Sequence, residues 1–153
     1  GLNIEGLAAG KDGGLLIGFR NPLIAGKAPV VPLKNPAEVV QGDRARFDTP
    51  ILLDLAGRGI RSIDRVGDHY LIVAGPVADA GTFALFRWSG SARDAPALQY
   101  ELPSGFSPEA LVPVAGSKDV DLLSDDGSTQ AAVACGSATK AKQMFRTIRV
   151  RLP

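Results

Sequence analysis

The sequence predicts an all-β fold of the β-propeller type, and three observations lead to this prediction. The apolar runs are short, and Gly, Pro, Asp or Ser residues bound each of them, which is typical of strands rather than helices. A pattern of strand, turn and strand occurs three times, beginning at Ile4, Ile60 and Pro108. The intervals between these residues are 56 and 48 residues, close to the length of one four-stranded propeller blade.

Each repeat supplies up to four strands. The first blade is expected to use residues 4–9, 14–20, 27–33 and 50–55, the second 60–65, 70–75, 82–88 and 97–102, and the third 108–114, 120–125 and 143–152. The blades thus cover about 4–55, 60–102 and 108–152 of a single segment, residues 1–153, and the last blade is incomplete. In the last strand Ile148 and Val150 alternate with Arg149 and Arg151, as in a strand with one face in the core.

Two stretches, residues 35–38 and 107–110, carry the residues that begin helices. In each, a capping residue precedes a proline and an acidic residue follows. Neither stretch continues as a long pattern of 3.6-residue period, so we interpret both as a turn or a single helical turn.

Three blades do not close a ring, because propellers typically contain four to eight. We therefore expect this chain to form part of a larger ring, completed by remaining blades of the same protein or by a second chain. Self-association is an alternative way to close the ring. A β-sandwich is the competing fold, since short strands at turn spacing also fit that architecture.

Composition and charge exclude several classes of function. Hydrophobic residues make up 45% and charged residues 22% of the 153, as in a typical soluble globular protein. The net charge is +1 and no basic stripe is present, so no nucleic-acid binding is expected. No apolar run approaches the roughly 20 residues of a membrane span. The single cysteine, Cys135, is expected to be a small buried thiol and is compatible with either the cytoplasm or the periplasm.

Seven segments together form a recognisable pattern. They are NIEGLA at 3–8, LIGFRNP at 16–22, GRGIRSI at 57–63, YLIVAGP at 70–76, FRWSG at 86–90, PEAL at 108–111 and LSDDG at 123–127. This pattern resembles the bacterial domain-of-unknown-function family thirty-six sixteen, which is similar to the esterase-like phytase propellers. The resemblance implies a propeller of which this chain is the C-terminal part. By analogy between folds it also implies phosphoester hydrolysis and calcium.

Propeller geometry predicts where a binding site would lie. In each blade the innermost strand starts, and the second strand ends, at the same mouth of the central channel. Glu5, Arg61 and Glu109 start the three inner strands, and Arg20 with Asn21 ends a second strand, so these side chains should lie near one another. Such a cluster suits a cation with oxygen ligands, or a small anionic ligand held by arginine forks.

Asp125 and Asp126 end another second strand and should border the same mouth as metal ligands. The sequence therefore favours a module that binds a ligand or partner at the channel mouth, through Glu5, Arg20, Arg61 and Glu109. The alternative is a calcium-assisted phosphoester hydrolase, in which clustered carboxylates bind a cation that activates water.

Each candidate residue also has a purely structural interpretation. Glu109 follows a proline and favours the start of a helical turn. The segment at 124–127 has ordinary hairpin-turn chemistry. Glu5 and Arg61 would pair simply to balance charge, and Arg20 would be a solvated strand end.

Known enzyme motifs are missing from the sequence. His69 is the only histidine, so a Ser-His-Asp triad would have to use it. We expect it instead to be an exposed turn residue. A zinc site is not expected with one histidine and one cysteine. Phe86 and Trp88 are expected to pack between blades.

Overall fold

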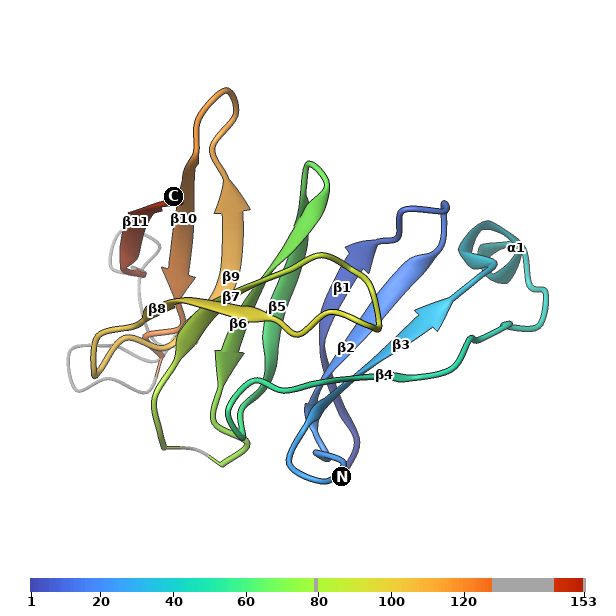
Figure 1. The fold of residues 1–153 in the computed structure, drawn as a ribbon, viewed down its shortest axis with the longest axis horizontal. Helices are drawn as coiled ribbons and strands as arrows, with labels where there is room; N and C mark the ends of the chain where they lie inside the picture. Colours follow the sequence, from blue (N-terminus) through green and yellow to red (C-terminus); the bar gives the residue numbers. More distant parts are fainter. Residues whose placement is uncertain (79, 128–144, 153) are drawn as a thin grey trace.

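The computed structural model describes residues 1–78, 80–127 and 145–152. In this part the chain is all-β, with three antiparallel sheets and one short helix (Figure 1). The first sheet contains β1 (Asn3–Ala9), β2 (Leu15–Asn21), β3 (Ala28–Leu33) and β4 (Ile51–Leu53). The second contains β5 (Gly59–Val66), β6 (His69–Gly75), β7 (Ala84–Trp88) and β8 (Ala97–Glu101). The third contains β9 (Pro108–Pro113), β10 (Asp119–Ser124) and β11 (Thr147–Arg151).

All three sheets are simple meanders, because each strand pairs with the next strand in the chain. The strands expected from the sequence are present, with ends that agree within two residues apart from the start of the last strand. That strand was expected from residue 143 but begins at Thr147, and residues 143–144 lie outside the described part of the chain. Cys135 also lies outside it.

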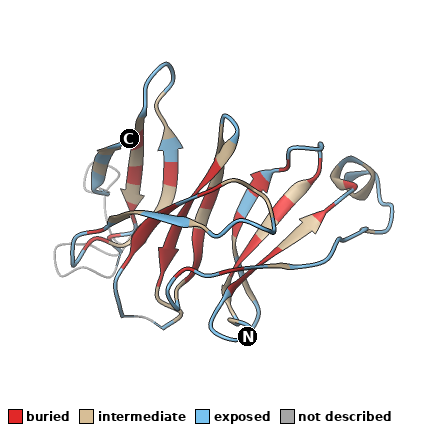
Figure 2. Ribbon diagram, viewed as in Figure 1, coloured by how far each residue is buried: buried red, intermediate tan, exposed pale blue. Residues whose placement is uncertain are grey.

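The first strands of the three sheets lie next to one another. β1 packs against β5, and β5 packs against β9. All three run in the same direction, upward in Figure 1. The sheets therefore follow one another side by side, and buried residues concentrate in the middle sheet, which has a neighbour on each face (Figure 2).

One hydrophobic core fills the space between the first and second sheets. The first sheet contributes Ala8, Leu16, Ala28, Val30 and Leu53, and the second contributes Ile60, Ile63, Tyr70, Ile72, Ala74, Ala84, Phe86 and Trp88. The aromatic rings of Tyr70 and Trp88 lie 5.5 Å apart. Both satisfy their polar atoms, since Tyr70 donates to the Ala9 carbonyl and Trp88 to the Ser91 carbonyl. This confirms the expected packing role of Phe86 and Trp88.

Glycines allow the first and second sheets to approach closely. Gly6 of β1 and Gly18 of β2 pair with each other and face Ile60 of β5. A Cβ atom on Gly6 or on Gly18 would lie 2.9 Å from a methyl group of Ile60, closer than real contacts allow. The side chain of Ile60 therefore fills the space that these two glycines leave.

A second core joins the second and third sheets. Leu71, Val73, Phe83, Leu85, Leu102 and Phe106 meet Leu111, Val120, Leu122 and Leu152, with Ile148 and Val150 partly buried against them. Arg149 and Arg151 point away from this core and are exposed, as the alternation in the sequence predicted. Arg149 forms an ion pair with Asp121 of β10.

The helix α1 (Pro36–Val40) lies in the connection between β3 and β4. It confirms the helical turn expected near residue 35. The buried Asn35 side chain holds this connection, because it accepts a hydrogen bond from the Arg46 amide and donates to the Arg44 carbonyl. The turn or single helical turn expected at residues 107–110 is wrong, since Pro108 begins strand β9, in agreement with the strand expected over residues 108–114.

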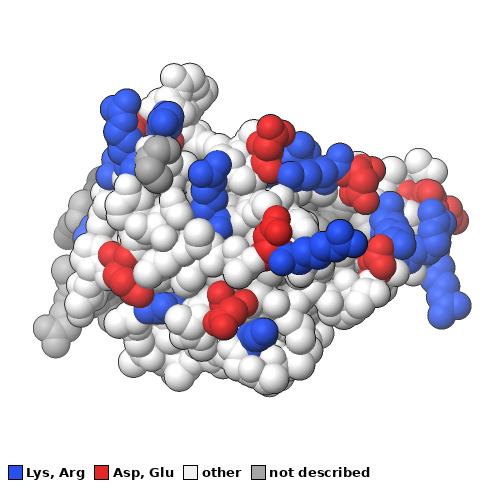
Figure 3. Space-filling view, viewed as in Figure 1, with Lys and Arg blue, Asp and Glu red and all other residues white. Residues whose placement is uncertain are grey.

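Surface charge is mixed in sign. On the face shown in Figure 3, lysines and arginines are interspersed with aspartates and glutamates, in keeping with the net charge of +1. Within residues 1–78, 80–127 and 145–152, no helix has the length and apolar character needed to cross a bilayer.

Candidate ligand-binding site

A β-bulge occurs at the same place in the first strand of each sheet. The pairs on either side of the extra residue are Ile4–Phe19 and Gly6–Gly18 in β1, Ile60–Ala74 and Ser62–Val73 in β5, and Pro108–Ser124 and Ala110–Leu123 in β9. The extra residues are therefore Glu5, Arg61 and Glu109. A bulge changes the direction of the side chain that it carries, and bulges are frequent beside functional sites.

The three bulges bring their charged side chains together. Arg61 Nη1 lies 2.7 Å from Glu109 Oε1 and 3.6 Å from Glu5 Oε2. Arg20, near the end of β2, joins them with its Nη1 atom 3.3 Å from Glu5 Oε1. We call Glu5, Arg20, Arg61 and Glu109 the bulge cluster. The structure thus assembles, from all three sheets, the four side chains that the sequence singled out as ligand-binding.

Arg61 is the most deeply buried member of the bulge cluster. Only 7% of its side chain is exposed. Besides the two carboxylates, it donates a 2.8 Å hydrogen bond to the Pro76 carbonyl, and its guanidinium lies 5.4 Å from the centre of the Phe83 ring. These contacts fix the guanidinium in place between the second and third sheets.

Arg20 is held against the second sheet and is not a solvated strand end. A Cβ atom on Gly59 would lie only 2.0 Å from the Arg20 carbonyl oxygen, so the backbone of β2 lies directly on the start of β5. The Arg20 side chain also donates to the Ala78 carbonyl at 3.2 Å. Asn3, which the sequence did not single out, donates a 2.9 Å hydrogen bond to Glu5 Oε1.

Three side-chain atoms at this end of the sheets are enclosed without a hydrogen-bond partner among the described residues. They are Glu5 Oε2, Asn21 Oδ1 and Arg61 Nε. Folded proteins leave few such atoms, because an unmatched buried polar group costs about 1–3 kcal/mol. Their concentration in one place indicates a site whose hydrogen bonding is incomplete in the chain alone.

Burial raises the pKa of the Glu109 carboxyl above its ordinary value. The positive charges of Arg61 and Arg20 oppose this rise in pKa, whereas the negative charges of Glu5 and Asp125 add to it. Asp125 is therefore close enough to influence the bulge cluster, although it forms no ion pair there in the described structure. Its carboxylate accepts a hydrogen bond from the Gly127 amide, as a hairpin-turn aspartate does.

Asp126 is directed to a different partner. Its carboxylate binds the guanidinium and the backbone amide of Arg146 and accepts a hydrogen bond from the Ser124 hydroxyl. The bonds from Arg146 lower the pKa of Asp126 to about 2. No pattern in the sequence indicates this pair, since Asp126 and Arg146 are 20 positions apart and in no recognised motif.

The arrangement of carboxylates does not fit the calcium ion that the resemblance implied. Calcium takes six to eight oxygen ligands, mostly from several carboxylates and carbonyls. The described residues contain no group of three or more Asp, Glu, His or Cys side chains placed to hold a metal. The Asp126 carboxylate is already ion-paired with Arg146, and the Arg61 guanidinium lies between the carboxylates of Glu5 and Glu109.

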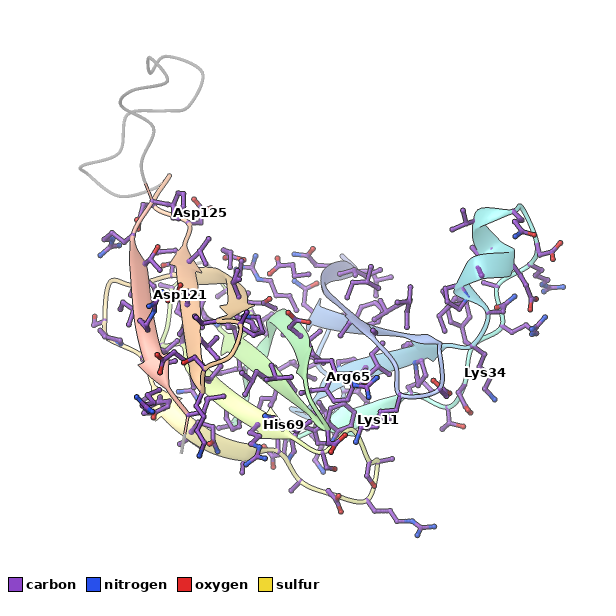
Figure 4. All side chains as sticks on the ribbon, turned by 90° about the horizontal axis from the view of Figure 1, so that it is seen from above. Lys11, Lys34, Arg65, His69, Asp121 and Asp125 are labelled. Carbon is purple, nitrogen blue, oxygen red and sulfur yellow. The ribbon has the colours of Figure 1, made fainter. Side chains whose placement is uncertain are left out.

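His69 is not an exposed turn residue, as the sequence suggested, but the half-buried first residue of β6. It lies near Lys11 and Arg65, on the opposite side of the sheets from Asp125 (Figure 4). Burial, together with the positive charge of Arg87, lowers the pKa of His69. Its position excludes it from the chemistry of the bulge cluster.

Fold and site together define a β-meander protein with a charged cluster built on three equivalent bulges. The model of the family described as "Protein of unknown function (DUF3616)" matches residues 1–120, and the chain belongs to this family. No curated protein and no solved structure gave a significant match.

Proposed function

We propose that the three sheets are consecutive blades of a β-propeller. Three features support this proposal: each sheet is a meander, the innermost strands lie side by side in the same direction, and each of these strands carries a bulge at the same position. In a propeller the innermost strands line the central channel. The bulge cluster would then lie at one mouth of this channel.

The ring would be completed by further blades of the same protein or by a second chain. Support comes from the residue two positions after each bulge. Ile63 and Leu111 are only 4% and 6% exposed because each packs toward the preceding sheet, whereas the equivalent Leu7 is 61% exposed. Ile17 and Val31, which follow Leu7 across the first sheet, are only half-buried. A preceding blade would cover this apolar face.

A crystal structure of the longest natural protein that contains this chain tests the propeller proposal. We expect a closed ring with β1, β5 and β9 along the channel and Leu7 buried by another sheet. A two-layer sandwich without a channel would contradict the proposal.

For the activity, we infer that the bulge cluster binds a small charged ligand. The observation that carries this inference is the repeated bulge, which directs one charged side chain from each sheet to a single point. The enclosed, unmatched atoms of Glu5 and Arg61 add support, because a ligand would supply the missing hydrogen bonds. A recognition module of this kind requires no catalytic group.

Nuclear magnetic resonance of the ¹⁵N-labelled chain tests this function. The probes are ethanolammonium, guanidinium, acetate, inorganic phosphate and glycerol, each compared with sodium chloride at equal ionic strength. We expect at least one probe to shift the amide signals of Glu5, Arg61 and Glu109 in a saturable way. Arg61→Met should abolish the response.

The matched control is Arg146→Met, which breaks a different arginine–carboxylate pair, that with Asp126. It should leave the response at the bulge cluster intact. If no probe shifts these signals, or if both variants lose the response equally, the proposed function is wrong.

A further inference from the structure

The charges of the bulge cluster are arranged by depth. The Arg61 guanidinium is the innermost group, with 7% of its side chain exposed, whereas 35% of Glu109 is exposed. Asp125, whose charge reaches Glu109, is also exposed. Arg20 and Glu5 are intermediate, with 17% and 20% of their side chains exposed, so the most exposed charges are the carboxylates of Glu109 and Asp125.

The guanidinium groups are also largely occupied. Arg61 donates to Glu109 and to the Pro76 carbonyl, and Arg20 donates to Glu5 and to the Ala78 carbonyl. An anion would have to displace carboxylates that already neutralise these arginines. With Asp125 included, three carboxylates face two guanidinium groups, so the local charge favours a cation.

The unmatched atoms specify the ligand further. Glu5 Oε2 and Asn21 Oδ1 are acceptors and need N–H or O–H donors, which an ammonium group supplies. Arg61 Nε is a donor and needs an acceptor oxygen. A metal ion coordinates acceptor oxygens but supplies no acceptor for Arg61 Nε–H, and the described residues hold no three-ligand metal group.

On these grounds, and given the proposed binding function, we propose that the bulge cluster binds a small organic cation with an ammonium group next to a hydroxyl or carbonyl oxygen. The ammonium group bonds the carboxylates of Glu5 and Glu109 and the amide oxygen of Asn21, and the neighbouring oxygen accepts from Arg61 Nε. Glu109 is the most exposed of the four side chains, so its carboxylate turns from Arg61 toward the ligand on binding.

Ethanolammonium carries both required groups and is the probe for this proposal. We expect it to shift the Arg61 Nε–H signal and the amide signals of Glu5 and Glu109, and to bind more tightly than either inorganic phosphate or glycerol. Glu109→Gln should weaken its affinity about fivefold, since one partly exposed charge is removed. Asp125→Asn should weaken it about twofold, because it removes a second, exposed negative charge beside Glu109.

Glu38→Gln is the matched control, because Glu38 is also a partly exposed glutamate paired with an arginine, Arg46, but lies in α1. Its affinity for ethanolammonium should equal that of the parent chain. If phosphate shifts the cluster and ethanolammonium does not, the ligand class is wrong and the binding function stands. If none of the five probes shifts it, both proposals fail.

Discussion

Replacing Arg61 by methionine should destabilise the chain by about 3 kcal/mol, because three acceptors lose a buried donor at once. Methionine keeps most of the apolar contact with Phe83 but removes the 2.7 Å bond to Glu109, the 2.8 Å bond to the Pro76 carbonyl and the ion pair with Glu5. The partly buried Pro76 carbonyl and the Glu5 carboxylate, whose Oε2 atom is enclosed, account for most of the cost. Glu109 contributes less, since 35% of its side chain is exposed and water replaces part of its bond.

Urea unfolding followed by circular dichroism measures this loss. For a chain of this size, about 3 kcal/mol corresponds to a fall in melting temperature of roughly 6–12 °C. Glu109→Gln retains an oxygen that accepts from Arg61, so it should cost about 1 kcal/mol or less. If Arg61→Met changes the free energy of unfolding by less than 0.5 kcal/mol, roughly the effect of an ordinary surface substitution, the cluster does not join the sheets as described.

Three further predictions concern other parts of the chain. Gly59→Ala should lower the free energy of unfolding in urea by about 3 kcal/mol or more, because its Cβ would lie 2.0 Å from the Arg20 carbonyl oxygen. Gly105→Ala has open space around it and should lower this free energy by only about 1 kcal/mol, because of its positive φ. Equal losses would contradict the close approach of β2 and β5. The lowered pKa of His69 means that burial favours its neutral form, so its contribution to stability is present above pH 6.5 and is lost as the pH falls toward the folded-state pKa. His69→Gln should therefore flatten the plot of unfolding free energy against pH between pH 7.5 and 5. An unchanged plot would argue against burial of the imidazole. Asp126 has a folded-state pKa of about 2 against an ordinary 3.8, so the stability that it confers is present above about pH 4 and is lost toward pH 2. Asp126→Asn should be less stable than the parent chain at pH 7, and the difference in unfolding free energy should shrink between about pH 4 and pH 2.

The strands could be predicted because their signal is local. Short apolar runs bounded by Gly, Pro, Asp or Ser marked the strands without knowledge of their neighbours, and the last strand also showed alternation of apolar and polar residues. The two stretches with helix-start residues, 35–38 and 107–110, show that local signals do not always decide the structure. Residues 35–38 form a helical turn because Asn35 anchors the connection, whereas the same chemistry before Glu109 gives way to pairing between β9 and β10.

The repeat also predicted which charged side chains would meet. Glu5, Arg61 and Glu109 occupy equivalent positions in the three repeats, and equivalent positions in adjacent sheets lie close together in space. The sequence could not reveal the bulges that aim these side chains, because a bulge depends on how a strand pairs with its neighbour. Nor could it reveal that Arg146 would bind Asp126, which removed that residue from the expected metal site.

The sequence by itself therefore determined the class of fold, the order of the strands and the equivalence of three charged positions, since all of these follow from local periodicity and repetition. Only the tertiary structure decided which groups are buried, which carboxylate each arginine binds and which hydrogen bonds remain unmade. These properties depend on distances of a few ångströms between strands far apart in the chain, and side-chain period and turn chemistry carry no information about such distances.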